Sequence, residues 1–394
     1  MPKDANRLKL DFIIIFIIFA FAVISIYTLH FIEPYLSASV SGQNLYLKQM
    51  FWYIVGGAVA GAVMILDYDR FRSVAWILYG FGVLSLIGLY VLPETISKVV
   101  YGARGWYQIP GTTQTIQPVE FMKIFLLITV AHVITSHNEK REIKGIKDDL
   151  WLLGKILLVA LPPLLLTAGL PDLGSAIVLT CIVSFLILVS GIRWRILLTI
   201  IGVTVAAVGA FVGLYLLFPD VVKDTLNETI FQHVLVRLEA FFEPQQNTGG
   251  SAYQINNAML AIGSGQLFGK GFSEMEVYVP VLETDMIFAA IAEQSGFIGA
   301  SIVVTLFFLL IYRIILTALN CKDPFGSYLC AGIVGMITYQ VIQNIGMTVK
   351  IMPITGLPLP FISYGGSSML AFMMAIGIVL NVYSRRKTYM FDDE

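Results

Sequence analysis

Two oppositely charged residues stand inside a long apolar run of the sequence. Glu120 and Lys123 lie three residues apart in Gln117-Pro-Val-Glu-Phe-Met-Lys123, a spacing that puts both on one face of a helix, where they can pair. An ionisable pair at membrane depth is costly and usually faces a bundle interior or a wet cavity. Either the pair only holds helices together, or it belongs to a pocket for an anionic head group. In that pocket Lys123 would be the cation and Glu120 would fix its position.

A second candidate cation is Arg104, in Gly102-Ala-Arg-Gly-Trp-Tyr-Gln-Ile-Pro-Gly111. A guanidinium among glycines and aromatic residues at a membrane surface can bind phosphate through its forked donors. Trp106 and Tyr107 are equally well explained as anchors at the membrane interface. The spacing alone does not choose between phosphate binding and anchoring.

Lys270 lies in a glycine-rich turn, Gly263–Gly271, which follows a helical stretch that starts near Tyr253. Glycines allow a close approach of the backbone, so Lys270 could meet a phosphate there. The turn is not a Walker loop, because that motif requires Gly-Lys-Ser/Thr after a strand and before a helix. A lone glycine-rich turn is only a weak indication of phosphate binding.

Asp285 precedes an apolar segment in Tyr278-Val-Pro-Val-Leu-Glu-Thr-Asp-Met-Ile-Phe288. Thr284 as N-cap with Asp285 in the first helical turn would be an ordinary helix start. The alternative is a carboxylate held at the membrane surface, facing a cavity and acting as a general base. Asp172, in Leu170-Pro-Asp-Leu-Gly-Ser175, has the same two interpretations.

These candidate residues belong to a chain that is too apolar for a water-soluble enzyme. Of its 394 residues, 57% are hydrophobic and 13% charged, with a mean hydropathy of +0.80, against about 45–50% and 25% in soluble domains. The composition also excludes disorder and a disulfide scaffold. The net charge of -1 gives no indication of nucleic-acid binding, and we expect no nucleic-acid partner. The three cysteines lack metal-ligand spacing, and we find no closed metal site.

Ten apolar segments can cross a membrane, which requires about 20 residues. We therefore expect an all-α polytopic membrane protein with the spans 12–31, 50–66, 73–92, 117–136, 150–168, 173–190, 196–218, 285–318, 326–347 and 367–384. The eighth is too long for one straight crossing, so we expect its first part, with Glu293 and Gln294, in a wet, protein-lined region. The first segment has no small-residue cleavage site, so it is interpreted as a retained helix rather than a signal peptide.

The basic residues orient these spans. Lys and Arg residues outside the spans are concentrated in loops on the side of the N-terminus, so the positive-inside rule puts both termini in the cytoplasm. The 66-residue loop 219–284, between the seventh and eighth spans, is then extracytoplasmic and too long for a mere connector. We find no internal repeat and interpret residues 1–394 as one membrane domain.

Taken together, these motifs resemble the SEDS family (shape, elongation, division and sporulation) from the first span to the last. The resemblance rests on the segments around Arg104, Glu120 and Asp285, and on Asp172-Leu-Gly-Ser-Ala176, Ala261-Ile-Gly-Ser-Gly265 and Pro353-Ile-Thr-Gly-Leu-Pro-Leu-Pro-Phe-Ile-Ser-Tyr-Gly-Gly-Ser-Ser368. The short tails and the segment Gly102–Trp106 are more similar to the RodA branch than to the FtsW branch.

The resemblance implies a peptidoglycan glycosyltransferase that polymerises lipid II at the outer face of the cytoplasmic membrane, for cell elongation and shape. The family's essential aspartate corresponds to Asp285, the expected general base for an inverting displacement of undecaprenyl diphosphate. We expect the substrate-binding residues to be Arg104, Glu120, Lys123, Lys270, Ser363 and Tyr364, with Lys350 as a further candidate cation. A divalent cation, Mg²⁺ or Mn²⁺, could share the charge of the diphosphate. Glu283 is expected to raise the pKa of Asp285 by like-charge repulsion.

The resemblance also implies partners: lipid II, the growing glycan strand, a class B penicillin-binding protein that crosslinks the strands, and the elongation machinery. Two other functions are compatible with the same residues. One is a lipid II flippase; the other is a non-catalytic scaffold for the crosslinking partner, in which Asp285 only caps a helix. A flippase needs polar residues through the membrane depth, whereas the charged residues here cluster at the outer end. This pattern favours an enzyme.

Overall fold

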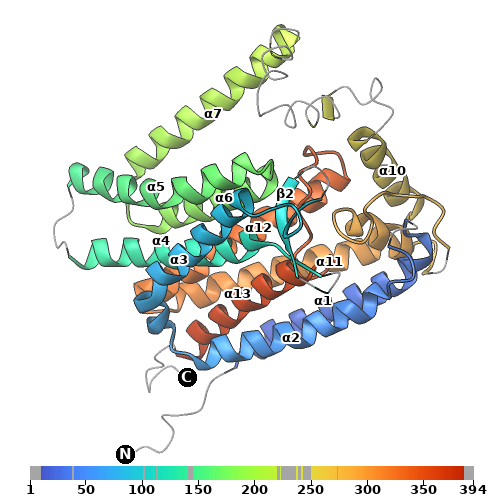
Figure 1. Cartoon of the computed structure of the whole chain (residues 1–394), viewed down its shortest axis with the longest axis horizontal. Coiled ribbons are helices and arrows are strands. Elements are labelled where there is room, and N and C mark those ends of the chain that lie inside the picture. The colour runs from blue at the N-terminus through green and yellow to red at the C-terminus, as the bar shows by residue number, and fades with distance from the viewer. Residues whose placement is uncertain are drawn as a thin grey trace, which may run out of the picture.

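The computed structural model describes residues 10–37, 40–100, 103–109, 111, 114–140, 145–219, 222, 237, 241–242, 250–272 and 274–385. The two termini, for which a cytoplasmic location is predicted, and parts of the predicted loop 219–284 lie outside the described residues. Within the described ranges, long helices run side by side and a small sheet lies near one end of them (Figure 1).

Ten helices correspond to the ten predicted spans. They are α1 (Phe12–Ile32), α2 (Leu45–Ile65), α3 (Tyr68–Val91), α4 (Pro118–Glu139), α5 (Ile146–Gly169), α6 (Leu173–Val189), α7 (Trp194–Leu217), α11 (Ile287–Leu319), α12 (Pro324–Thr348) and α13 (Gly366–Ser384). Among the described residues, nine of these helices are long and apolar enough to cross a membrane, and α6 is a shorter apolar helix of 17 residues. The predicted polytopic, helical fold class is thus confirmed.

The structure differs from the prediction in two ways. Helices α2 and α3 begin at Leu45 and Tyr68, earlier than expected, because their first turns include polar residues; Asp67 caps α3 by accepting the N–H of Asp69 (3.2 Å). The outer segment 93–116 forms a three-stranded antiparallel sheet that the all-α prediction did not include. Its strands are β1 (Ser97–Val100), β2 (Ala103–Gln108) and β3 (Thr115–Ile116).

Aspartate N-caps fix where several helices start. Asp11 accepts the N–H groups of Ile13 and Ile14 at the start of α1, and Asp323 accepts those of Phe325 and Gly326 at the start of α12. Each such cap satisfies N–H groups that have no partner within the helix and contributes about 1 kcal/mol.

Helix α11 is broken near its beginning, at Gly296, where the backbone is non-helical (φ 64°, ψ -163°). A side chain there would collide with the backbone of Leu267 and Gly269, so the break depends on glycine. The part before the break is buried in protein, including Glu293 and Gln294. The expected protein-lined start of this span is therefore present, and its expected wetness stays a prediction.

Helices α4, α12 and α13 form the centre of the bundle. In their most apolar 18-residue stretches, 78%, 67% and 72% of the residues are buried, respectively. Helix α7, with 6% buried, projects away from the other helices (Figure 1). The short amphipathic helix α10 (Ser251–Ser264) packs on α11. Its polar face and its position outside the predicted spans agree with a helix at the membrane surface.

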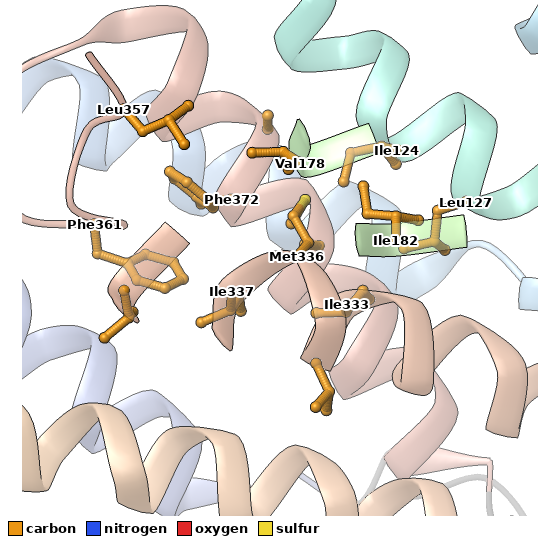
Figure 2. Close-up of a cluster of buried hydrophobic side chains, with 14 of the residues drawn as sticks. Ile124, Leu127, Val178, Ile182, Ile333, Met336, Ile337, Leu357, Phe361 and Phe372 are labelled. Atoms are coloured by element: carbon orange, nitrogen blue, oxygen red, sulfur yellow. The ribbon is translucent and has the colours of Figure 1, made fainter. Parts of the chain in front are cut away.

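The core lies where α4, α6, α12 and α13 meet the loop that precedes α13, as Figure 2 shows. The labelled side chains of this cluster are Ile124, Leu127, Val178, Ile182, Ile333, Met336, Ile337, Leu357, Phe361 and Phe372. All of them are buried. Because Leu357 and Phe361 belong to the loop itself, the core anchors that loop on the central helices.

Ion pairs join the helix ends on the side where α1 begins and α13 ends. Three of them are Arg313–Asp11 (3.0 Å), Arg385–Asp67 (3.3 Å) and Arg193–Asp149 (3.5 Å). Their basic members are residues that the sequence places in or next to cytoplasmic loops.

Candidate active site

Asp285 lies in a turn that immediately precedes α11. The carbonyl of Val281 accepts the N–H groups of Thr284 (3.4 Å) and Met286 (3.3 Å), which closes a turn over residues 281–286. Helix α11 begins at Ile287, and its N-cap residue is Met286, which provides no side-chain cap. The interpretation of Thr284 as N-cap with Asp285 in the first turn is therefore wrong. Contacts outside the helix have to account for the position of Asp285.

The Asp285 carboxylate is half-buried and faces the loop that follows α12. A Cβ added to Gly356 would stand 3.4 Å from its Oδ2 atom. Two further charged residues, Arg237 and Asp172, interact with it electrostatically. The charges of a cation and of a second carboxylate, from two other segments of the chain, thus act on the Asp285 carboxylate, and a third segment, the loop with Gly356, faces it.

Burial raises the pKa of Asp285 from its ordinary value of 3.8 to about 6. A hydrogen bond with Thr284 and the charge of Arg237 lower this pKa, whereas the charges of Glu283 and Asp172 raise it. The predicted repulsion from Glu283 is present, but it is weaker than the effect of burial. A carboxylate whose pKa lies close to neutral pH is suited to take up a proton as a general base.

Arg237 is a site residue that the sequence did not single out. One guanidinium nitrogen donates to the carbonyl of Thr355 (3.4 Å), next to Gly356. Burial lowers the pKa of Arg237, and the charges of Asp172 and Asp285 oppose that effect. In the sequence, the stretch Val234-Leu-Val-Arg237 is an ordinary part of a long outer loop and matches no motif. No local pattern could therefore have marked this residue.

Asp172 has a structural role in addition to its place near Asp285. It is the N-cap of α6, where it accepts the N–H of Ser175 (3.0 Å), and it also accepts the side-chain amide of Gln117 (3.3 Å). The helix-start interpretation of Asp172 is confirmed. Its charge nevertheless acts on both Arg237 and Asp285.

Ser363 and Tyr364 lie against the turn that carries Asp285. The Ser363 hydroxyl donates to the carbonyl of Thr284 (2.5 Å), and the N–H of Tyr364 donates to the carbonyl of Glu283 (2.9 Å). The structure thus brings both predicted residues to the site. The bonds it gives them are to the protein backbone.

Glu120 and Lys123 form the predicted pair, with 2.7 Å between Oε1 and Nζ. Their side chains are 2% and 0% exposed. The Lys123 ammonium also lies 3.5 Å from the Gln340 side-chain oxygen and 5.8 Å from the ring centre of Phe372. The second carboxylate oxygen of Glu120 has no hydrogen-bond partner among the described residues. The pairing is confirmed, and its role in binding stays a prediction.

Arg104 supports the small sheet. Its Nε donates to the Ser97 hydroxyl (3.0 Å), and a second guanidinium nitrogen donates to the carbonyl of Leu92, where α3 ends. These bonds fasten β2 to the end of α3. Its expected contact with a phosphate stays a prediction.

Lys270 is paired with two carboxylates, Glu276 (2.7 Å) and Glu293 (3.2 Å). The hydrogen bond with Glu276 is the main reason why the pKa of Lys270 is raised. Lys350 follows the end of α12 with a positive φ of 59°. In the described ranges, no group of three or more His, Cys, Asp or Glu residues could hold a metal ion.

A groove of about 610 Å³ opens beside the site, between α10, α11 and α12. It starts at Phe288, one turn after Asp285, and extends along α11 to Thr305. Its lining includes the small residues Gly263, Ala292, Ala300 and Ser301. Because the lining is almost entirely apolar, the groove suits an apolar occupant.

Comparison with known proteins decides the family. The family model for cell cycle proteins of the FtsW, RodA and SpoVE type matches residues 8–388. This chain belongs to the SEDS family. The match extends over nearly the whole sequence, as the order of the motifs predicted.

Relatives of this SEDS protein have similar lengths. Stage V sporulation protein E of Bacillus subtilis is 32% identical over 345 residues, which cover 86% of this chain and 87% of that protein. Peptidoglycan glycosyltransferase MrdB of Escherichia coli is 32% identical over 355 residues, 89% of each chain. The likeness to MrdB agrees with the predicted similarity to the RodA branch.

Solved structures share the fold of this SEDS protein. A chain of a peptidoglycan synthase complex that coordinates polymerization and crosslinking matches with a TM-score of 0.74 and 28% identity, over 96% of this chain and 99% of that one. The rod shape determining protein RodA of Thermus thermophilus matches with a TM-score of 0.67 and 27% identity, over 98% and 100%. The chain is a multi-pass membrane protein.

Proposed function

We propose that this SEDS protein polymerises lipid II into glycan strands, with Asp285 as the general base. Relatives named peptidoglycan glycosyltransferases support the reaction class. The observation that carries the assignment of the base is a half-buried carboxylate, held outside the helix, whose pKa is raised to about 6 although the charge of Arg237 acts to lower it. A residue that served only as a helix cap would occupy the position of Met286 instead.

In the proposed step, Asp285 takes the proton of the acceptor sugar hydroxyl while the hydroxyl oxygen attacks the anomeric carbon of the lipid-linked donor. The bond between that carbon and the diphosphate oxygen breaks, and undecaprenyl diphosphate leaves with the electron pair. One displacement converts the α-linked donor into a β-linked product and requires no covalent enzyme intermediate. Base catalysis of this kind contributes about 10²–10⁴-fold to the rate.

Arg237 is the cation that we add to the six predicted substrate-binding residues. Its forked donors suit a phosphate, and it interacts with both Asp285 and Asp172. Lys123 and Lys270 are already paired with carboxylates, so each would have to exchange a partner to bind the diphosphate. A divalent cation, Mg²⁺ or Mn²⁺, would need oxygens of the diphosphate among its ligands, since the described residues offer no cluster for it.

The reaction is proposed to take place at the outer face of the cell membrane. Asp285 lies at the start of α11, whereas Arg313, near the other end of that helix, pairs with Asp11 at the start of α1. The positive-inside rule assigns the end with Arg313 to the cytoplasm. Asp285 is then extracytoplasmic, on the side where the glycan strand grows.

The crosslinking partner is proposed to be a class B penicillin-binding protein whose membrane helix packs into the groove between α10, α11 and α12. Small residues such as Ala292, Ala300 and Ser301 line this groove, and small residues let membrane helices approach closely. A solved relative belongs to a complex for polymerization and crosslinking. Ser301→Trp would fill the groove and is expected to lower co-purification of the partner, whereas the exposed Val205→Trp on α7 should not.

The deciding experiment is polymerisation of labelled lipid II by the purified protein with its cognate penicillin-binding protein, from which any glycosyltransferase domain is absent. Wild type is compared with Asp285→Ala and Asp285→Asn. We expect glycan strands from wild type and a loss of at least about 10²-fold in both variants. More than about a tenth of wild-type activity in Asp285→Ala would overturn the assignment of the base.

The same experiment distinguishes the flippase and the scaffold. No strands from wild type, with the partner demonstrably bound, would refute the polymerase. Transport of a labelled lipid II head group across a vesicle membrane would then identify a flippase. Binding without transport would identify a scaffold.

A further inference from the structure

Three consecutive carbonyl groups of the turn that carries Asp285 accept hydrogen bonds from residues far along the chain. The carbonyl of Glu283 accepts from the N–H of Tyr364 (2.9 Å), and that of Thr284 from the hydroxyl of Ser363 (2.5 Å). The carbonyl of Asp285 itself accepts from Nδ2 of Asn344 (2.8 Å). None of these three bonds belongs to a helix or sheet ladder of the turn itself, so the position of the turn depends on them.

A second set of three bonds holds the segment that provides Ser363. The carbonyls of Phe361, Ile362 and Ser363 accept from Tyr53 (2.5 Å), Ser25 (2.6 Å) and Gln49 (3.1 Å), respectively. Tyr53 and Gln49 belong to α2, and Ser25 belongs to α1. The first two helices therefore hold the segment that in turn holds the Asp285 turn.

Asn344 links this arrangement to the loop on the other side of the carboxylate. Its Nδ2 donates to the carbonyls of both Asp285 and Leu357 (2.8 Å each), and its side chain is fully buried. Leu357 follows Gly356, which faces the carboxylate. One amide group thus fixes the distance between the residue that carries the carboxylate and the loop that faces it.

Backbone strain is present in both segments. Val281 and Phe361 have positive φ angles of 57° and 66°, which are unfavourable for a β-branched or bulky residue. Strained residues persist only where the surrounding structure determines them, and they cluster at active sites. Here the two sets of hydrogen bonds to backbone carbonyls hold the strained segments in place.

We propose that Asn344 and Tyr53 are positioning residues that hold Asp285 in its reactive position. The inference rests on the proposed polymerase activity. Asn344 acts on the backbone of Asp285 directly, and Tyr53 acts through the segment with Ser363. Neither residue touches the reacting atoms.

The test compares Asn344→Leu and Tyr53→Phe with wild type in lipid II polymerisation, at several pH values and lipid II concentrations. Misplacing a catalytic group by about 1 Å costs about 10²-fold in rate, so Asn344→Leu should lower kcat by about that factor with little change in KM. Tyr53→Phe loses one hydrogen bond and should lower kcat by about 2- to 10-fold. In both variants the fall of the polymerisation rate on the acid side of the pH–rate profile (the acid limb) should move to lower pH. The reason is that Asp285 becomes more hydrated, which lowers its pKa, while Glu283, Arg237 and Asp172 stay in place.

Matched controls separate positioning from stability. Asn381 is also fully buried and donates to two backbone carbonyls, those of Val63 and Leu66, but it lies at the far end of α13. Asn381→Leu should lower the melting temperature as much as Asn344→Leu and leave kcat per folded molecule unchanged. Tyr27→Phe, on the exposed face of α1, is the control for Tyr53→Phe.

The outcomes are distinguishable. Equal losses of kcat in Asn344→Leu and Asn381→Leu, or an unchanged kcat in Asn344→Leu, would overturn the positioning role while wild-type activity stands. Absence of strands from wild type would refute the polymerase, and with it the inference that rests on it.

Discussion

The carboxylate of Asp285 faces Gly356, and a Cβ added there would be in van der Waals contact with Oδ2, at 3.4 Å. Gly356 has a φ of +73°, which L side chains rarely adopt. Its neighbours accept the hydrogen bonds of Arg237, at Thr355 (3.4 Å), and of Asn344, at Leu357 (2.8 Å). Gly356 therefore lines the site, and hydrogen bonds to its two neighbours hold its backbone in place.

Gly356→Ala should strongly impair the reaction. The methyl group would contact the Asp285 carboxylate, and the positive φ would strain the loop by about 1 kcal/mol or more. We expect a loss of about 10-fold or more in kcat for polymerisation of lipid II. Gly42→Ala is the matched control, because Gly42 has a φ of +77° and open space around it. Equal effects of both substitutions would mean that strain alone, without contact to Asp285, explains the loss.

The membrane fold could be predicted from the sequence because each span is a long apolar run. Nothing comparable marks the small sheet in segment 93–116, whose strands are short, from two residues in β3 to six in β2. The starts of α2 and α3 were misplaced for a related reason. Their first turns hold polar residues such as Lys48 and Arg70, which hydropathy alone assigns to loops.

The site was only partly predictable, for a physical reason. The Glu120–Lys123 pair follows from helical spacing, which is a local property. Asn344 bonds to the carbonyl of Asp285, and the charge of Arg237 acts on the Asp285 carboxylate, although both residues lie far from Asp285 in the sequence. No local pattern encodes such relationships. The capping interpretation of Thr284 failed because long-range bonds to the turn outweighed local capping.

Activity should depend on the ionisation of Asp285. A general base must be deprotonated, and burial raises the pKa of Asp285 to about 6. The rate should therefore be nearly maximal above about pH 7 and fall about tenfold per pH unit below about pH 5.5. A pH series of initial polymerisation rates measures this limb. A limb near about pH 4, the ordinary range of an exposed aspartate, would contradict a buried base.

Replacing the base should stabilise the fold at neutral pH. The pKa of Asp285 is higher in the folded than in the unfolded state. Folding therefore has its full stability below the unfolded pKa, where the carboxyl is protonated in both states, and loses stability as pH rises through about 6, where a buried carboxylate must ionise. Asp285→Asn cannot ionise, so it should be more stable than wild type by about 1–2 kcal/mol at about pH 7.5, allowing for solvent screening. Melting temperatures at about pH 5 and about pH 7.5 test the sign. A variant that is destabilised at the higher pH would show that the carboxylate is stabilised in the fold.

The Glu120–Lys123 pair can be tested by a double-mutant cycle. Lys123→Ala leaves the buried Glu120 carboxylate without its partner and should cost about 3–5 kcal/mol of stability. We expect it to be more damaging than Arg104→Ala, because Arg104 is only partly buried. Combining Glu120→Ala with Lys123→Ala should restore much of the stability. If the double variant also regains polymerisation, the pair is structural; if it stays inactive while folded, the pair binds substrate.

Arg237→Ala should affect both binding and the pKa of the base. Loss of the guanidinium removes a cation that we assign to the diphosphate, so KM for lipid II should rise by about 10-fold, as for a lost charge-assisted hydrogen bond. It also removes the positive charge that lowers the pKa of Asp285, so the acid limb should move to higher pH. This direction is opposite to that expected for Asn344→Leu, and it separates the electrostatic role from the positioning role. Arg195→Ala, in a predicted cytoplasmic segment, is the control and should change neither quantity. An acid limb that moves to lower pH in Arg237→Ala would mean that the guanidinium does not face the base.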